Sequence, residues 1–135
     1  MSCVFCMIRD GKIPSTKVHE GERTLAFMDI NPINAGHLLV VPKAHTPTVL
    51  EVGEEDMAAT YRVAKRLAGA VQKTLNPGGM VVAQFNGAAA FQSVPHFHVH
   101  VIPRWEDDGK GFTWELIKGD PAKIADTAAK IRAAL

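Results

Sequence analysis

The chain has 135 residues, of which 47% are hydrophobic and 21% charged, and its formal net charge is +1 at neutral pH. This size fits a single domain, residues 1–135, whose core needs no disulfides for stability. The near-neutral charge excludes nucleic acid or an anionic membrane as a partner bound by bulk electrostatics. No apolar run approaches the ~20 residues of a membrane helix, and the first residues do not resemble a secretory signal. We therefore expect a cytoplasmic protein.

The first 42 residues favour short elements separated by turn-forming residues. In chain order these are a helical turn within residues 1–10, a hairpin of strands 17–20 and 24–28, a turn over 29–36 and an apolar strand over 37–42.

A long helix is predicted next. It begins near Glu54, where three acidic residues suit the positive end of the helix dipole, and it ends at residues 76–79, Asn-Pro-Gly-Gly. Its apolar stripe recurs at steps of three and four residues and consists of Met57, Tyr61, Ala64, Ala68, Val71 and Leu75.

The second half of the chain predicts two strands and one more helix. The strands cover residues 80–85 and 94–103, and the helix begins at Asp120-Pro121, a cap followed by a first-turn proline. The buried stripe expected on this helix is Ile124, Ala128, Ile131 and Leu135. Strands in consecutive pairs, with helices between and after them, indicate an α+β domain on a mostly antiparallel sheet.

Three of the six histidines lie within five residues, in the run His96-Phe97-His98-Val99-His100. Alternation along a strand sends the three imidazoles to one face and the apolar residues to the core. A solvated, histidine-rich strand face is the alternative, although histidine is not a strong strand former. The Cα atoms of His96 and His100 would be about 13 Å apart, which disfavours one metal site built from all three. His98 and His100 could instead flank a phosphate, because neutral imidazole is a good nucleophile near pH 7.

The pattern His-φ-His-φ-His-φ-φ, with φ apolar, resembles the signature of the histidine-triad (HIT) family. Residues 3–103 are similar to its Hint-like branch, the small nucleoside phosphoramidases, and the supporting blocks occur in the same order. These blocks are residues 13–15, 25–30, 36–45 and 92–94. The resemblance implies the HIT-like fold: a mostly antiparallel sheet of about five strands, one long central helix and a C-terminal helix.

The resemblance also implies a role for each site residue. His98 would attack the α-phosphorus and carry the nucleotidyl group until water releases a nucleoside monophosphate. His100 would contact the phosphate and assist proton transfer to the leaving group, and His37 would orient the ring of the nucleophile. The remaining residues implied to bind nucleotide are Asn86, Gln92 and Ser93 at the phosphate, Asp29 at the ribose, and Ile8, Phe27 and Ile30 around the base. Each of these three apolar residues could equally be ordinary core.

Cys3 and Cys6 are too close together in the chain to form a disulfide framework across the fold. The pair could be a redox site, two ordinary thiols, or half of a zinc site; a redox site normally follows a strand, and no strand precedes residue 3. Some bacterial HIT proteins resemble this chain in having the pair, and they add two histidines, here His45 and His96. That resemblance implies a structural Zn²⁺ with four protein ligands.

The expected function is hydrolysis of nucleoside phosphoramidates or related nucleoside 5′-phosphate conjugates through a nucleotidyl-histidine intermediate. The expected partners are a purine nucleotide such as AMP or GMP and a second copy of the chain in a homodimer. A dinucleoside polyphosphate hydrolase and a nucleotide-binding or scaffold protein with incidental turnover are the alternatives.

Two places depart from the family pattern or fall outside it. Phe91 precedes the Gln-Ser pair where many relatives have glycine, which leaves the shape of the phosphate loop open. Trp105 and Trp114 lie in a segment that does not align residue by residue, and either could contact the leaving group or pack locally.

Overall fold

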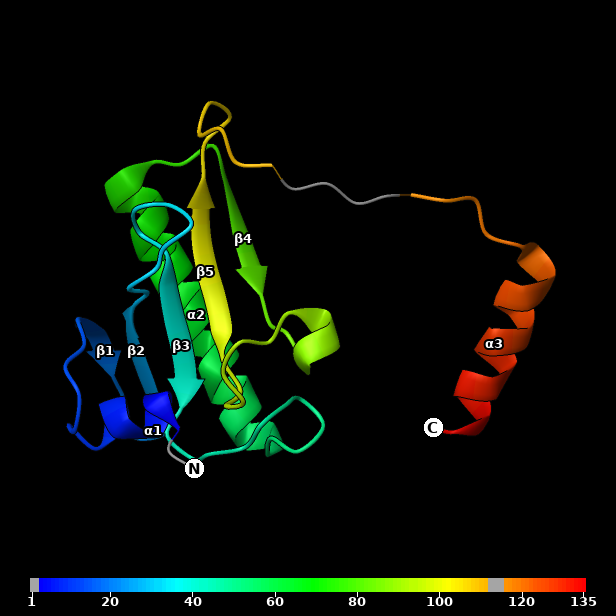
Figure 1. The fold of residues 1–135 in the computed structure, drawn as a ribbon, viewed down its shortest axis with the longest axis horizontal. Coiled ribbons are helices and arrows are strands. Elements are labelled where there is room, and N and C mark those ends of the chain that lie inside the picture. Colours follow the sequence, from blue (N-terminus) through cyan, green and yellow to red (C-terminus); the bar gives the residue numbers. More distant parts are fainter. Residues whose placement is uncertain (1–2, 112–115) are drawn as a thin grey trace.

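The computed structural model describes residues 3–111 and 116–135. Its elements are α1 (Val4–Arg9), β1 (Lys17–Glu20), β2 (Thr24–Met28), β3 (Leu38–Pro42), α2 (Glu54–Leu75), β4 (Gly79–Ala83), the short 3₁₀ turn η1 (Ala88–Ala90), β5 (Val99–Arg104) and α3 (Pro121–Ala133). The five strands form one antiparallel sheet in the order β1-β2-β3-β5-β4. Figure 1 shows α2 behind this sheet and α1 in front of its lower edge. The α+β class and the five-strand antiparallel sheet are therefore confirmed.

The sheet is covered on both faces, and alternation within each strand supplies a core to each. Ala26, Val40 and Val99 point to the face under α2, together with Phe97 and Val101. On the opposite face, Leu25 and Phe27 of β2 and Leu39 and Val41 of β3 pack against Phe5 and Ile8 of α1. Double coverage explains why β3 is apolar at every position, since a strand with one wet face alternates apolar and polar residues.

Helix α2 has the predicted ends, but its buried face is rotated from the predicted one. Asn76 closes the helix in the left-handed conformation. Thr60, Val63, Ala64 and Val71 are buried, whereas the predicted stripe members Tyr61 and Leu75 are 42% and 41% exposed. Thr60 can be buried because its hydroxyl donates to the carbonyl of Asp56 one turn earlier, which satisfies the polar group. None of the described helices is long and apolar enough to pass through a bilayer.

Strand β5 begins at Val99, five residues later than the predicted start at Val94. Pro95 has no amide hydrogen to donate, and the amide of Phe97 donates to the carbonyl of Thr46 in a loop instead of to a neighbouring strand. His96 and His98 therefore precede the paired strand. Phe97 nevertheless reaches the α2 core, so the predicted alternation of sides extends beyond the hydrogen-bonded ladder.

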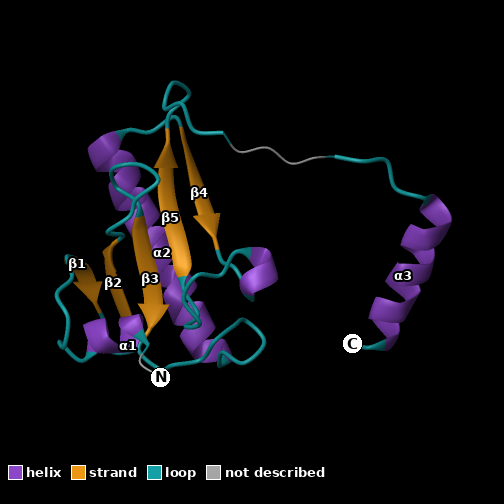
Figure 2. Ribbon diagram, viewed as in Figure 1, coloured by secondary structure: helices purple, strands orange, loops and turns teal. Residues whose placement is uncertain are grey.

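Helix α3 forms where predicted, and the Asp120 side chain accepts from the Ala122 amide as its cap. The prediction that its apolar stripe is buried is wrong: Ile124 and Ile131 are 60% and 59% exposed, and Leu135 is exposed as well. Figures 1 and 2 show α3 well apart from the sheet. Local capping and helix propensity explain why the helix forms. Among the described residues, no part of this chain covers its apolar stripe.

The turn before β3 depends on Gly36, which has a φ of 96°. A Cβ atom at this position would lie 2.5 Å from Cδ1 of Leu75 and 3.1 Å from Cγ of Pro103. The turn therefore needs glycine both for its backbone conformation and for the close approach of α2 and β5.

We predict that Gly36→Ala lowers the free energy of unfolding by about 2 kcal/mol, because strain at positive φ adds to the steric overlap. Gly11→Ala is the matched control: Gly11 has a φ of 72° but no atom within 4 Å of the added Cβ. Backbone strain alone should cost it about 1 kcal/mol. Urea denaturation measures both, and equal losses for the two variants would contradict the packing role of Gly36.

Candidate active site and metal centre

A pocket of about 270 Å³ opens between α1, β2 and the histidine segment. Its apolar wall includes the predicted base-contacting residues Ile8, Phe27 and Ile30. Its polar end contains Asp29 and Ser93 and the rings of His98 and His100, so most of the expected nucleotide-binding set lines one cavity. An apolar cavity with a few convergent polar groups is the usual form of a small-molecule site.

The ring of His98 is buried and has a defined tautomer. Its Nδ1 lies 2.6 Å from the carbonyl oxygen of His96. A carbonyl can only accept, so Nδ1 carries the proton and Nε2 keeps its lone pair. Burial lowers the pKa of His98 below its ordinary value, which favours the neutral ring. His98 thus presents an unprotonated nitrogen, the form of imidazole that acts as a nucleophile.

The ring of His100 has the opposite tautomer, and His37 determines it. The amide of Ile33 donates to Nδ1 of His37 over 3.0 Å, so the proton of His37 is on Nε2. That Nε2 lies 3.0 Å from Nδ1 of His100, which must accept the hydrogen bond and leave its own proton on Nε2. Burial lowers the pKa of His37 below its ordinary value. Burial also lowers the pKa of His100, to about 4. His37 was expected to orient the nucleophile; its hydrogen bond goes to His100 instead.

Asp29 lies beside this pair, with Oδ2 3.4 Å from Nε2 of His37. Its other oxygen accepts from the amide of Asn31. Asp29, His37 and His100 are close enough together to suggest a metal site. The tautomer of His37 argues against one. Nδ1 of His37 already accepts a hydrogen bond, so a metal bound at Nε2 would leave the ring with no proton on either nitrogen. The group is better suited to hydrogen bonding than to coordination.

The phosphate loop, residues 86–93, is braced by two of the residues expected to contact phosphate. Asn86 exchanges amide hydrogen bonds with Gln84 and accepts from the amide of Val49. Gln92 accepts from the amide of Gly87 and donates to the carbonyl of Pro47. Both side-chain amides are therefore engaged by other protein groups, and of the three residues expected at the phosphate only Ser93 lines the described pocket.

Phe91 shows why glycine is favoured at its position in this loop. It has a φ of 67° and its side chain is 85% exposed. A residue with a Cβ pays about 1 kcal/mol in this left-handed region, which glycine does not. The loop keeps its shape with a strained residue, since the hydrogen bonds of Gln92 hold it on both sides.

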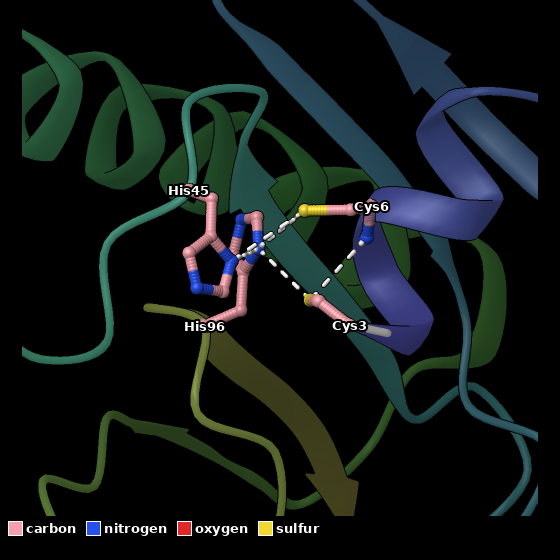
Figure 3. A group of neighbouring side chains, drawn as sticks. All are labelled: Cys3, Cys6, His45 and His96. Atoms are coloured by element: carbon pink, nitrogen blue, oxygen red, sulfur yellow. Dashed lines mark hydrogen bonds between the residues drawn. The ribbon is translucent and has the colours of Figure 1, made fainter. Parts of the chain in front are cut away.

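Cys3, Cys6, His45 and His96 form a separate cluster at the first turn of α1. Figure 3 shows Cys3 and Cys6, at the start of α1, facing the rings of His45 and His96. Nδ1 of His96 lies 3.4 Å from Sγ of Cys3, 3.6 Å from Sγ of Cys6 and 3.1 Å from Nδ1 of His45, and the last nitrogen is 3.5 Å from Sγ of Cys6.

These separations and the tautomer of His96 fit a tetrahedral metal ion. Zinc bonds of ordinary length imply about 3.3 Å between two ligand nitrogens and about 3.6 Å between nitrogen and sulfur. Nε2 of His96 donates to the carbonyl of Pro42 over 2.8 Å, so Nδ1 is unprotonated and faces the cluster. Metal-binding histidines commonly use the second nitrogen in this way. The four residues could therefore hold a metal.

Sequence reasoning missed Phe5, whose ring is 5% exposed and lines the pocket. Its centroid is 5.0 Å from that of His98 and 5.8 Å from that of His96, in edge-on orientations. The apolar spacing of Phe5 and Ile8 on a short helix was the available signal, but it does not tell which surface the helix covers. Trp105 follows β5 at the end away from His98 and is absent from the described pocket lining, and Trp114 lies outside the described residues.

Comparison with known proteins gives one consistent result. The family model for the HIT domain matches residues 10–107. Adenosine 5′-monophosphoramidase hnt1 of Schizosaccharomyces pombe is 38% identical over 125 residues, which are 92% of this chain and 91% of the yeast protein. The crystal structure of a HIT family member from Bacillus subtilis is 36% identical, with a TM-score of 0.92 over 100% of this chain and 98% of that one. A zinc-bound histidine triad family protein from Mycobacterium smegmatis is also 36% identical, with a TM-score of 0.78 over 100% and 99%.

We predict that the His100 ring titrates well below pH 6.5, near the value of about 4 that burial gives it. Because this pKa is lower in the folded than in the unfolded chain, the neutral ring stabilises the fold fully above about pH 6.5. That contribution is lost as the pH falls toward 4. An NMR titration of the imidazole nitrogens measures the midpoint.

His37→Asn is the informative variant for the same titration. It removes a neighbouring ring that lowers the pKa of His100, so the midpoint should move upward. A wild-type midpoint at or above the ordinary value of about 6.5 would contradict the assigned hydrogen bonds.

Proposed function

The chain belongs to the HIT family, and from that premise we propose that it hydrolyses nucleoside phosphoramidates or related nucleoside 5′-phosphate conjugates. The observation that carries this proposal is the pair of opposite tautomers in the pocket: an unprotonated Nε2 on His98 beside a protonated Nε2 on His100. A nucleophile next to a hydrogen-bond donor is what a displacement at phosphorus needs. The name of the yeast relative, a monophosphoramidase, supports this substrate class.

In the first step, the lone pair of His98 Nε2 forms a bond to the α-phosphorus and the bond from phosphorus to the leaving group breaks. The Nε2–H of His100 hydrogen-bonds to the phosphate or leaving group and assists its protonation. In the second step, water adds to the phosphorus and the bond to His98 breaks. The proton that the water loses replaces the one that the leaving group took up, and a nucleoside monophosphate departs. Covalent catalysis of this kind divides one difficult displacement into two easier ones.

The pocket supports a purine nucleotide such as AMP or GMP as the ligand. Ile8, Phe27 and Ile30 would contact the base, and Asp29 would accept from the ribose hydroxyls. Ser93 would bind the phosphate, while Asn86 and Gln92 keep the loop in shape. We further propose a homodimer, which the exposed apolar stripe of α3 supports.

We also propose that the metal is Zn²⁺ and that its role is structural. Cys3, Cys6, His45 and His96 supply two thiolates and two imidazoles, a donor set typical of zinc. Four protein ligands complete a tetrahedron and leave no position for substrate. The zinc-bound mycobacterial relative supports this choice of metal.

The catalytic proposal is tested by measuring turnover of adenosine phosphoramidate and, as alternative substrates, of diadenosine polyphosphates. We expect His98→Ala to lose at least about a thousandfold in kcat, because no nucleophile remains, while AMP binding changes little. His37→Asn should lower kcat by about tenfold or more, since the His100 tautomer is no longer fixed. His19→Asn on β1 is the matched control and should keep full activity. A wild-type protein that binds AMP but turns over none of these substrates would contradict the proposal.

The metal proposal is tested by elemental analysis and competitive zinc titration. Cys3→Ser and Cys6→Ser should each weaken zinc binding by more than about tenfold, because a hydroxyl is a poor replacement for a thiolate. His19→Ala should keep one zinc per chain. Unchanged stoichiometric zinc in either cysteine variant would rule out the four-residue site.

A further inference from the structure

Helix α1 lies between the metal cluster and the nucleotide pocket and belongs to both. Cys3 caps the helix and Cys6 is in its first turn, and their sulfur atoms face His45 and His96 (Figure 3). Val4, Phe5 and Ile8 of the same helix line the pocket. The side chains that α1 contributes to the two sites therefore come from one stretch of six residues, residues 3–8.

A six-residue helix is not stable by itself, so α1 depends on what holds it. Helices shorter than about 12 residues are marginal in water even with favourable sequences. Phe5 and Ile8 are buried against β2 and β3, and Arg9 donates to the carbonyl of Lys43 over 2.7 Å. The first turn contacts the rest of the chain through the buried ring of Phe5 and through the four-residue cluster. A metal bound at the cluster would add a second fixed point to that turn.

Phe5 is the residue through which the position of α1 reaches the nucleophile. Its ring meets the ring of His98 at 83° and that of His96 at 72°. One edge of His98 is held by its hydrogen bond to the His96 carbonyl, and Phe5 restricts the rotation that this single bond leaves free. Edge-on contacts between aromatic rings are attractive beyond the burial of their surface.

We propose that α1 is a metal-dependent positioning element: metal at the Cys3-Cys6-His45-His96 cluster orders the helix, Phe5 then holds the ring of the nucleophile His98, and Val4 and Ile8 complete the base wall. Phe5 is a positioning residue, and the metal contributes without touching substrate. This inference rests on the proposed function for its kinetic part. Its binding part requires only that the pocket accepts a nucleotide.

Metal binding and nucleotide binding should be thermodynamically linked in both directions. If metal raises the affinity for nucleotide by some factor, nucleotide must raise the affinity for metal by the same factor. Couplings of this kind are typically about 5- to 150-fold. A structural metal that held only a distant part of the fold would give no coupling.

The first experiment measures this linkage on the full wild-type chain. The chain is freed of metal with a chelator, shown to remain folded by circular dichroism, and titrated with AMP with and without one equivalent of Zn²⁺. We expect zinc to tighten AMP binding by at least about fivefold, and AMP to tighten zinc binding equally. Hydrogen exchange should slow in residues 4–9 when zinc is added. Equal AMP affinities with and without zinc would overturn the inference, and so would a chain that binds no zinc.

The second experiment separates positioning of the nucleophile from lining of the pocket. Phe5→Leu and Phe27→Leu make the same change at two buried rings that pack against each other and line the same cavity. Among the described residues, the ring of Phe5 packs edge-on against His96 and His98, whereas the ring of Phe27 packs against Phe5. Phe5→Leu should lower kcat by about tenfold and shift the ring-nitrogen NMR signals of His98, whereas Phe27→Leu should mainly raise KM. Equal effects of the two variants on kcat would overturn the role of Phe5.

The two proposals fail in different ways. Absence of turnover with intact zinc–AMP linkage would reject the hydrolase function and leave α1 as a metal-dependent wall of a binding site. Full turnover without linkage would reject the inference and leave the hydrolase function in place. The linkage measurement uses no variant, so a misfolded mutant cannot decide the outcome.

Discussion

The hydrogen bond from Nδ1 of His98 to the carbonyl oxygen of His96 connects the two halves of this molecule's chemistry. On the His98 side it fixes the tautomer that leaves Nε2 with a free lone pair. On the other side, His96 is held through its own Nε2 by Pro42 and turns its Nδ1 to the cysteine cluster. The segment from His96 to His98 lies outside the regular sheet, so these side-chain bonds, and not a strand ladder, determine where the ring of His98 lies.

The covered sheet makes this arrangement possible. β3 and β5 pair so that Leu39 lies opposite His100, and Val99 and Val101 point to the α2 core on the other face. Apolar residues on one side hold the segment in place, which frees the other side for polar groups. Burial of the imidazoles costs little because each has a hydrogen-bond partner or a neutral form suited to a partly apolar pocket.

The strands and the long helix were predictable because their patterns are local. Alternation, turn residues and helical spacing located β1 to β3 and α2 closely, and capping located α3. The failures concern contacts between elements. Whether Ile124 is buried depends on a partner surface, and the start of β5 depends on which carbonyl receives the amide of Phe97. A single sequence contains neither kind of information in its periodicity.

The same division holds for the site. Spacing alone disfavoured one metal site shared by the three triad histidines, whereas the grouping of His96 with His45 followed from the family resemblance. That His37 bonds to His100 and that Phe5 packs against the ring of His98 are consequences of tertiary packing. No residue count or motif predicts an edge-on ring contact between α1 and the triad segment.

The charge of the site has a consequence for turnover. The described residues that line the pocket include no lysine or arginine, and burial keeps His98 and His100 neutral near pH 7. A nucleotide phosphate would therefore be held by hydrogen-bond donors and polarised rings, not by a buried ion pair. Breaking a buried ion pair leaves an uncompensated charge at high cost, whereas neutral donors exchange a phosphate for water more easily. In the proposed reaction, a neutral site would favour departure of a charged monophosphate product. It would also require accurate positioning of the His98 ring, because electrostatic attraction would not place the substrate against it.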